Sequence, residues 1–245
     1  MVVFVISGAS YGLGPELVRQ ASHDHQNTVF ALVESAQAAK RLAGLSSVRS
    51  NIHIYFETQR DRHAGYEIIA RDISRTVPYV DILLNIVSWV GDCLGTRNLS
   101  RPNQTNDLQQ SFSNHVLDTI HITNAFIPLL HRGSLKKVVT ISSDQAFNHH
   151  AGWPSGFDGG IAYAMGKKAL DMTISRYSGV PELQQNRFVY AMIECEPVNT
   201  SEKKKGDCSE DIQRQVQEIF EMVERLGCDD SGRCVKLREC DLITF

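Results

Sequence analysis

The chain has 245 residues, of which 42% are hydrophobic and 22% are charged, and this fits one globular domain with a substantial core over residues 1–245. A formal net charge of -3 offers no basic surface for nucleic acid, and no apolar run approaches the roughly 18 residues that a membrane span requires. We therefore expect a cytoplasmic protein without a nucleic-acid or membrane partner.

Segments with the patterns of strands and helices alternate along the chain. In chain order, we expect a strand at residues 2–7, a helix at 12–23, a strand at 28–33, a helix at 36–45, a strand at 51–56, a helix at 64–77, a strand at 80–87, a helix at 108–130 that ends near Pro128, a strand at 136–143, a helix at 162–177, a strand at 187–195, a helix at 209–227 and a short strand at 232–239. Apolar runs of this kind are typical of strands that are buried on both faces. The alternation predicts an α/β fold, a doubly wound parallel sheet of about seven strands with helices on both faces.

Three glycines stand between the first predicted strand and the first predicted helix. Gly8, Gly12 and Gly14 occupy the place where a glycine-rich turn lets the backbone approach a pyrophosphate at a helix N-terminus. The alternative is a tight turn that only needs small residues. We assign cofactor contacts to the turn residues Gly8, Ser10, Tyr11, Gly12, Leu13 and Gly14.

A tyrosine and a lysine lie four residues apart in the helix predicted at 162–177. Tyr163 and Lys167 project from the same side of such a helix, so the ammonium group can lie near the phenol. The spacing alone is common and proves little. A catalytic interpretation needs support from other parts of the chain.

The cysteines and histidines indicate no metal site. The six cysteines are scattered, with no CxxC pair and no histidine at a zinc-like spacing: Cys93, Cys195, Cys208, Cys228, Cys234 and Cys240. The pairs His23/His25 and His149/His150 do not form an HExxH pattern. We expect free thiols and no bound metal.

Four segments together resemble the short-chain dehydrogenase/reductase family. They are the glycine turn with Gly8, Gly12 and Gly14, the "DILLN" strand ending at Asn85, the "TISS" strand ending at Ser143, and the Tyr163-xxx-Lys167 pair. Their order and rough positions match that family from Val2 to the final "SGRCVKLREC". The resemblance implies a Rossmann-like fold and an NAD(P)-dependent oxidoreductase that interconverts a hydroxyl and a carbonyl group.

The resemblance also implies roles for individual residues. Tyr163 would be the acid/base, and Lys167 would lower its pKa and hold the nicotinamide ribose. Ser143 would orient the substrate oxygen, although its hydroxyl could also merely complete a strand. Further cofactor contacts would come from Asn85, Val198 and Thr200.

The sequence departs from the family pattern at the usual catalytic asparagine. Counting back 13 residues from Pro128, that position is held by His115, while Asn114 would point about 100° away on a regular helix. His115 could carry a proton in its place, the relay could be absent, or a local helix irregularity could restore Asn114. We include His115 among the candidate catalytic residues.

A long segment separates Ser143 from Tyr163: Tyr163 lies 20 positions after Ser143, where the family commonly has about a dozen. Its aromatic residues, together with Trp89, predict a wall for an apolar or aromatic small-molecule substrate. These residues are Phe147, His149, His150, Trp153 and Phe157. The alternative is a surface excursion that packs on itself.

The choice between NAD(H) and NADP(H) depends on the end of the second strand. Glu34 lies 20 residues after Gly14, the spacing of an acid that binds the ribose 2′-hydroxyl, and it would repel a 2′-phosphate. We expect a slight preference for NAD(H). Lys40 and Arg41 could still support NADP(H).

Three alternatives remain open at this point. An enzyme of this fold could use its cofactor and Tyr163 for an isomerisation or a cyclisation, as the altered "NIVS" and "CEPV" segments suggest. A nucleotide-sensing regulator would not need the retained Ser143, Tyr163 and Lys167. A cofactor-free relative resembling the halohydrin dehalogenases would not need Lys167 and the glycine turn. The resemblance further implies a homodimer or homotetramer, paired through residues 108–130 and 162–177.

Overall fold

One sheet runs through the centre of the molecule in the order β3-β2-β1-β4-β5-β6-β7-β8. The computed structural model describes residues 1–57, 62–86, 104–143, 160–195, 210–237 and 242–243. The strands are β1 (Val3–Ser7), β2 (Thr28–Val33), β3 (Ile52–Phe56), β4 (Ile82–Ile86), β5 (Lys137–Ser143), β6 (Val189–Cys195), β7 (Cys234–Lys236) and β8 (Leu242–Ile243). Strands β1 to β7 pair in parallel, which confirms the predicted doubly wound sheet of about seven strands.

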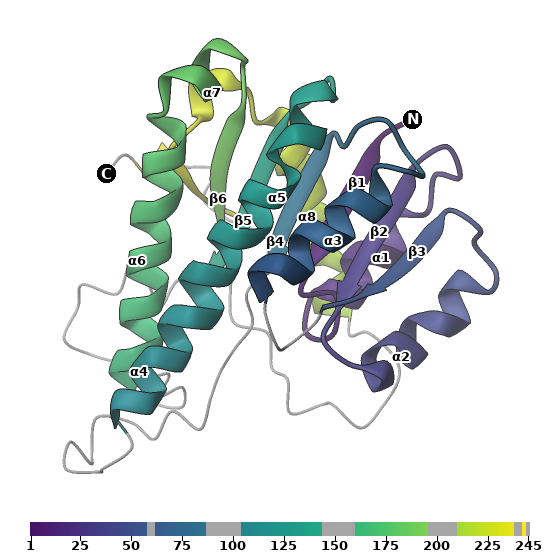
Figure 1. Ribbon diagram of the computed structural model, residues 1–245, viewed down its shortest axis with the longest axis horizontal. Helices are drawn as coiled ribbons and strands as arrows, with labels where there is room; N and C mark the ends of the chain where they lie inside the picture. Colours follow the sequence, from purple (N-terminus) through teal and green to yellow (C-terminus); the bar gives the residue numbers. More distant parts are fainter. Residues whose placement is uncertain (58–61, 87–103, 144–159, 196–209, 238–241, 244–245) are drawn as a thin grey trace.

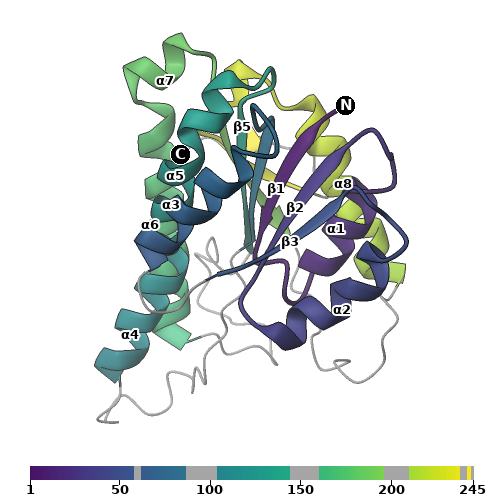
Figure 2. The ribbon, with the colours of Figure 1, turned by 45° about the vertical axis from the view of Figure 1, so that its right-hand side comes forward.

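Helices cover both faces of this sheet (Figures 1 and 2). They are α1 (Gly14–Ala21), α2 (Ala36–Ser46), α3 (Arg62–Ile73), α4 (Gln104–Phe112), α5 (Asp118–Arg132), α6 (Gly160–Ser178), α7 (Pro181–Gln185) and α8 (Glu210–Arg225). Helices α1, α2 and α8 pack on one face, and α3, α5 and α6 on the other. Strands with apolar side chains on both sides require this arrangement, because each face must be shielded from water.

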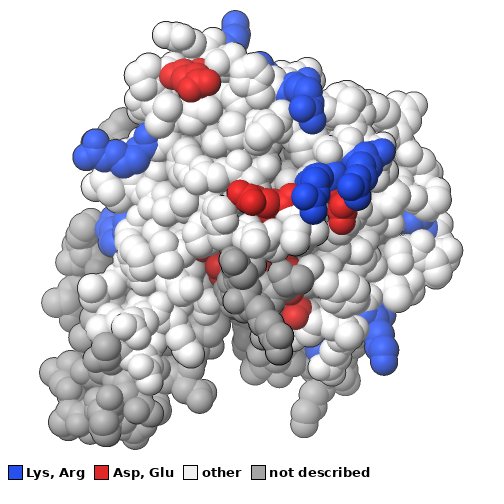
Figure 3. Space-filling view, in the orientation of Figure 1, with Lys and Arg blue, Asp and Glu red and all other residues white. Residues whose placement is uncertain are grey.

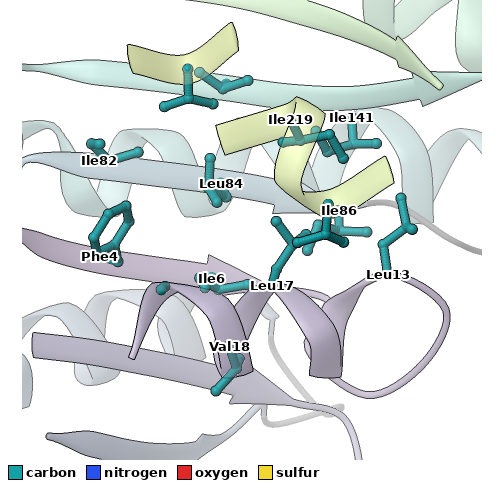
Figure 4. Close-up of a cluster of buried hydrophobic side chains, with 14 of the residues drawn as sticks. Phe4, Ile6, Leu13, Leu17, Val18, Ile82, Leu84, Ile86, Ile141 and Ile219 are labelled. Carbon is teal, nitrogen blue, oxygen red and sulfur yellow. The ribbon is translucent and has the colours of Figure 1, made fainter. Parts of the chain in front are cut away.

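Two apolar cores result, one on each face of the sheet. Figure 4 shows the core under α1 and α8, where Ile6 and Leu84 from neighbouring strands meet Leu17 and Ile219 from the two helices. The second core holds Phe126 of α5, which is fully buried. Because β1 to β7 are parallel, their carboxyl ends lie at one edge of the sheet, and the two cores hold the sheet from both faces.

The strand order reverses between β1 and β4, which are neighbours in the middle of the sheet. From β1 the chain proceeds outward through β2 and β3, and from β4 it proceeds the other way. Ligands of open α/β sheets bind beyond the carboxyl ends of the strands at such a reversal point. The glycine turn that follows β1 lies at this point.

The helix that we predicted at residues 108–130 differs from the prediction in two ways. It is interrupted by a π-helical turn, η2 (Ser113–Leu117), between α4 and α5. Pro128 does not end it, because α5 continues to Arg132. Proline removes one helical hydrogen bond, and the carbonyl group that loses its donor belongs to Asn124, an exposed residue.

Three short elements of the described residues were not predicted, among them the 3-10 turn η5 (Cys228–Asp230). Helix α7 has five residues, and β8 has two residues that pair antiparallel with β7. Segments of this length carry too few residues for a periodic pattern. They lie at the β7 side of the sheet and leave the parallel order unchanged.

Charged side chains do not gather into a single basic area on the face seen in Figure 3. There, the Lys and Arg side chains of the described residues lie apart from one another or beside Asp and Glu side chains. Among the described residues, none of the helices has the length and apolar character needed to cross a bilayer.

Candidate active site

The glycine turn lies against the end of β4. Gly8 and Gly12 have φ angles of +69° and +60°, a region that glycine adopts without steric cost. A Cβ on Gly8 would lie 1.9 Å from the carbonyl oxygen of Ile86, and one on Gly14 would lie 2.4 Å from the carbonyl oxygen of Gly8. The turn therefore needs glycine at these positions, and it leads directly into α1, which begins at Gly14.

The other predicted residues of this turn divide into buried and exposed ones. The buried hydroxyl of Ser10 accepts a hydrogen bond from the backbone N–H of Glu34, 2.9 Å away, and ties the turn to the end of β2. Leu13 is buried in the core. Tyr11 is exposed, and the guanidinium carbon of Arg41 lies 5.1 Å from the centre of its ring. This cation–π contact brings a positive charge from α2 to the glycine turn. The side chain of Glu34, at the end of β2, is exposed.

Asn85 lies inside the sheet, one residue before the end of β4. Its side chain is fully buried and donates a hydrogen bond from Nδ2 to Oγ1 of Thr123 at 3.3 Å. This contact joins β4 to α5. Whether Asn85 also contacts a cofactor remains a prediction.

The backbone places the predicted catalytic residues around the end of β5. Ser143 is the last residue of β5 and pairs in register with Cys195 of β6. Tyr163 lies in the first turn of α6, and Lys167 follows one turn later on the same helix. The side chains of Ser143 and Tyr163 lie outside the described part of the structure.

Lys167 carries a buried ammonium group beside β5. Its side chain is 1% exposed, and its Nζ lies 3.5 Å from the carbonyl oxygen of Ile141, two residues before Ser143. Burial lowers the pKa of Lys167 to about 8, and the charge of Asp171 partly opposes this shift. The ammonium form therefore still predominates at neutral pH, at the end of the strand that carries Ser143.

Asp171 lies one turn after Lys167 and is also buried. Burial raises the pKa of Asp171 to about 6, against the opposing charges of Lys168 and Lys167. The Nζ of Lys168 lies 3.5 Å from the carboxylate. At neutral pH an anion therefore supports the Lys167 ammonium from the same helix.

The π turn contains both candidates for the relay position. His115 is fully buried, whereas Asn114 is half-buried. The Nδ1 of His115 lies 3.0 Å from the hydroxyl of Ser111, and that hydroxyl donates to the carbonyl oxygen of Ala162 at 2.6 Å. The irregularity that we considered is present, and it is His115 whose side chain faces α6. A catalytic role of His115 stays a prediction.

Several predicted features fall outside the described residues. These are Val198 and Thr200, Trp89, and the aromatic segment with Phe147, His149, His150, Trp153 and Phe157.

Cys195, Cys228 and Cys234 are free thiols. In the described ranges, no group of three or more metal-ligating side chains comes together.

Sequence reasoning missed three residues that the structure brings to this site. Asp171 stands four residues after Lys167, and Ser111 stands four residues before His115, which are spacings of neighbours on one helix face. Gly166 lies where Ser111 and His115 approach α6. The spacings were visible in the sequence, but their burial was not.

Comparisons with known proteins agree with this arrangement. Residues 2–206 match the family described as short chain dehydrogenase. The chain is 33% identical to the short chain dehydrogenase virK of Hypocrea virens over 189 residues, which cover 72% of this chain and 67% of that protein. It is 30% identical to the uncharacterized oxidoreductase C24B10.20 of Schizosaccharomyces pombe, with 81% of this chain and 74% of that protein covered.

Solved structures show the same fold at low sequence identity. The NADPH-bound carbonyl reductase from chicken fatty liver superposes with a TM-score of 0.81 at 18% identity, with 100% of both chains covered. The carbonyl reductase Sniffer of D. melanogaster superposes with a TM-score of 0.76 at 20% identity, with 97% of both chains covered.

Proposed function

The chain belongs to the short-chain dehydrogenase family and is an NAD(P)-dependent oxidoreductase, and we propose that it interconverts a carbonyl and a hydroxyl group on a small apolar or aromatic molecule. The observation that carries this proposal is the buried ammonium group of Lys167, one helical turn after Tyr163 and beside the end of β5. A buried ammonium group at this place can lower the pKa of the Tyr163 phenol, which lies one turn earlier on the same helix.

The glycine turn fits a nicotinamide cofactor by its own geometry. Gly8 and Gly14 allow a tight turn, because a Cβ at these positions would meet the carbonyl oxygens of Ile86 and Gly8, and this turn leads directly into the N-terminus of α1. The partial positive charge of a helix N-terminus favours a pyrophosphate. We propose that this turn holds the pyrophosphate and that Lys167 holds the nicotinamide ribose. The bound cofactor would supply or accept a hydride.

The chain's own residues would handle the proton at the substrate oxygen. Ser143 would donate a hydrogen bond to that oxygen and hold it beside Tyr163. Tyr163 would give the proton during reduction and take it during oxidation. A phenol titrates near pH 10 in isolation, so the Lys167 ammonium has to lower its pKa before it works as a base near neutrality.

Two opposite charges near the glycine turn govern the choice of cofactor. The exposed carboxylate of Glu34 disfavours a 2′-phosphate, whereas Arg41 places a guanidinium group over the ring of Tyr11. We propose that Glu34 gives a slight preference for NAD(H) and that Arg41 keeps this preference small. The carbonyl reductase from chicken fatty liver was crystallised with NADPH, which makes binding of both cofactors a reasonable starting point.

We further propose that the protein pairs with copies of itself through α4, α5 and α6. Helices α4 and α6 lie side by side and carry exposed apolar side chains: Leu108, Phe112, Met165 and Met172. Light scattering would report a dimer or a tetramer, and a charge introduced by Met172→Glu should shift it toward the monomer.

The proposed activity can be tested with the purified protein. NADH and NADPH are first titrated and their fluorescence followed, and a panel of hydrophobic ketones and aldehydes is then assayed by the loss of nicotinamide absorbance. Tyr163→Phe should lower kcat by at least about 100-fold, because it removes the acid, with little change in cofactor affinity. Full activity of Tyr163→Phe would refute the mechanism, and failure of both cofactors to bind would refute the redox function.

A further inference from the structure

Two fully buried polar residues connect the α4–η2 segment to the start of α6. Ser111 and His115 are each 0% exposed and lie next to one another, with Nδ1 of His115 3.0 Å from Oγ of Ser111. The Ser111 hydroxyl donates to the carbonyl oxygen of Ala162 at 2.6 Å. We call these three groups, the His115 ring, the Ser111 hydroxyl and the Ala162 carbonyl, the polar clasp.

The direction of the hydrogen bonds in the polar clasp fixes the tautomer of His115. A carbonyl oxygen only accepts, so the single hydroxyl proton of Ser111 points to Ala162. The contact between Ser111 and His115 then needs its proton from the ring, and Nδ1 of His115 is the donor. The neutral ring therefore has its lone pair on Nε2, and a protonated ring would keep the same bond to Ser111.

A glycine makes room for the polar clasp. A Cβ on Gly166 would lie 2.5 Å from Oγ of Ser111 and 2.6 Å from Nδ1 of His115, well inside contact distance. Gly166 and Ala162 are four residues apart, so they stack on one face of α6. Ser111 and His115 therefore lie against Ala162, which directly precedes Tyr163, and against Gly166, which directly precedes Lys167.

The main chain of the π turn is held as well. The backbone N–H of Asp118 donates to the carbonyl oxygen of Ser113, and the hydroxyl of Thr119 donates to the carbonyl oxygen of His115 at 2.8 Å. Residue His115 is thus held at two places. Its ring nitrogen Nδ1 contacts Ser111, and its backbone carbonyl oxygen accepts a hydrogen bond from Thr119. Such a residue is well suited to positioning a neighbour.

We propose that Ser111 and His115 are positioning residues that fix the Tyr163–Lys167 turn of α6 through the Ala162 carbonyl, and that His115 does not carry the catalytic proton. This inference rests on the proposed function, because it assumes that Tyr163 is the acid/base. It assigns to Ser111 a role in the reaction and replaces the relay role that the sequence suggested for His115. What the reaction requires of His115 is then the N–H group at Nδ1, which donates a hydrogen bond to Ser111.

Substitutions of the two residues distinguish positioning from proton transfer. Ser111→Ala and His115→Ala should each lower kcat by about tenfold, with less than additive loss in the double variant, because they break one chain of hydrogen bonds. His115→Asn should retain most of kcat, since its amide nitrogen can donate from nearly the same place but cannot carry a proton. The pH profile of kcat should keep its shape in all of these variants.

A matched control exists at the other end of α6. The hydroxyl of Ser178 donates to the carbonyl oxygen of Ser175 at 2.7 Å, so Ser178→Ala removes a bond of the same kind far from Tyr163. It should leave kcat unchanged. If His115→Asn loses as much activity as His115→Ala and the pH profile loses one ionisation, His115 carries the proton and the proposal is wrong.

Two measurements need no turnover and separate this proposal from the proposed function. The ¹⁵N chemical shifts of the His115 ring should identify the proton on Nδ1, and a proton on Nε2 alone would overturn the polar clasp. Hydrogen exchange of the backbone amides in residues 160–167 should become faster in Ser111→Ala and His115→Ala but not in Ser178→Ala. Unchanged exchange would refute the positioning role. Faster exchange in a protein that reduces no carbonyl would refute the proposed function and leave the positioning of α6 supported.

Discussion

The glycine turn after β1 and the contact around Gly166 are two places where the chain approaches itself closely, and they are built from different atoms. The nearest atom to a Cβ on Gly8 would be the main-chain oxygen of Ile86 at 1.9 Å. The nearest atoms to one on Gly166 would be side-chain atoms of Ser111 and His115, at 2.5 and 2.6 Å. The first contact can change only if the sheet moves, whereas the second can change by exchanging side chains.

This difference bears on how far each of the two contacts can vary between relatives. The proposed cofactor half depends on backbone conformation, and there the family's glycines are kept. The contact around Gly166 depends on buried polar side chains, and there an ungapped count from Pro128 sets His115 at the position of the usual asparagine. A site made of side chains can be altered by compensating substitutions, but a site made of backbone cannot.

The largest effect should come from Gly8→Ala. The new Cβ meets a main-chain oxygen, and the φ angle of +69° strains any L side chain, so we expect a loss of about 3 kcal/mol in the free energy of unfolding and loss of cofactor binding. Urea unfolding and a nicotinamide titration would measure both. Gly44→Ala in α2 is the matched control, because a Cβ there would have nothing within 4 Å. The control should gain roughly 0.5–1 kcal/mol in the free energy of unfolding. Equal free energies of unfolding for the two variants would show that the backbone contact of Gly8 is not limiting.

Gly166→Ala should lower the free energy of unfolding by less than Gly8→Ala does, and a second substitution should restore part of the loss. Overpacking against Ser111 and His115 should cost about 2 kcal/mol of unfolding free energy. In a Ser111→Ala background the nearest clashing atom is gone, so about 1 kcal/mol of that loss should disappear. Urea unfolding of the two single variants and the double variant provides the test. Strict additivity would mean that the clash is not with Ser111.

Asp171→Asn should change how stability depends on pH. The folded-state pKa of Asp171 is raised from 3.8 to about 6, so the wild type binds this proton more tightly when folded. Its contribution to stability is complete below about pH 4 and is lost as the pH rises through about 6. Between pH 4 and 7, the wild type should therefore lose on the order of 2 kcal/mol relative to Asp171→Asn. Parallel unfolding curves over this range would show that Asp171 is not strained by burial.

The smallest effect should be on cofactor choice. Glu34→Arg should move the ratio of the NADH and NADPH dissociation constants toward NADPH by about tenfold, because a guanidinium group pairs with a 2′-phosphate. Arg41→Ala should move the ratio in the opposite direction. Fluorescence titration with both cofactors measures the ratio. If neither variant changes it, the two charges do not face the ribose.

Much of the fold could be predicted from the sequence because strands buried on both faces carry long apolar runs. The limits of β2 agree with the prediction, and β5 and β6 begin one and two residues later than expected. The η2 turn was only one of three alternatives in the sequence, and the contact of Ser111 and His115 with Gly166 needed the structure. Local propensity contains no information about that contact.

The candidate site was predictable in part. Tyr163 and Lys167 were selected by their spacing together with the family resemblance, and the glycine turn by its place between strand and helix; the structure shows both residues on α6 and the turn after β1. Asp171 and Ser111 were missed because polar residues in a helix are usually exposed, and composition does not reveal which of them a neighbouring helix covers. Arg41 was considered for its charge alone, and its contact with Tyr11 needed the structure.

The π turn also determines how this chain should be aligned with relatives. Bonds from residue i to i+5 make such a turn one residue longer than an α turn, and here the bond joins Ser113 to Asp118. Without a gap, an alignment counted back from Pro128 sets His115 against the usual asparagine. A gap of one residue inside 113–117 sets Asn114 there and leaves His115 as the added residue. Any property transferred from a relative to α4, including one assigned to Ser111, shifts by one position with that gap.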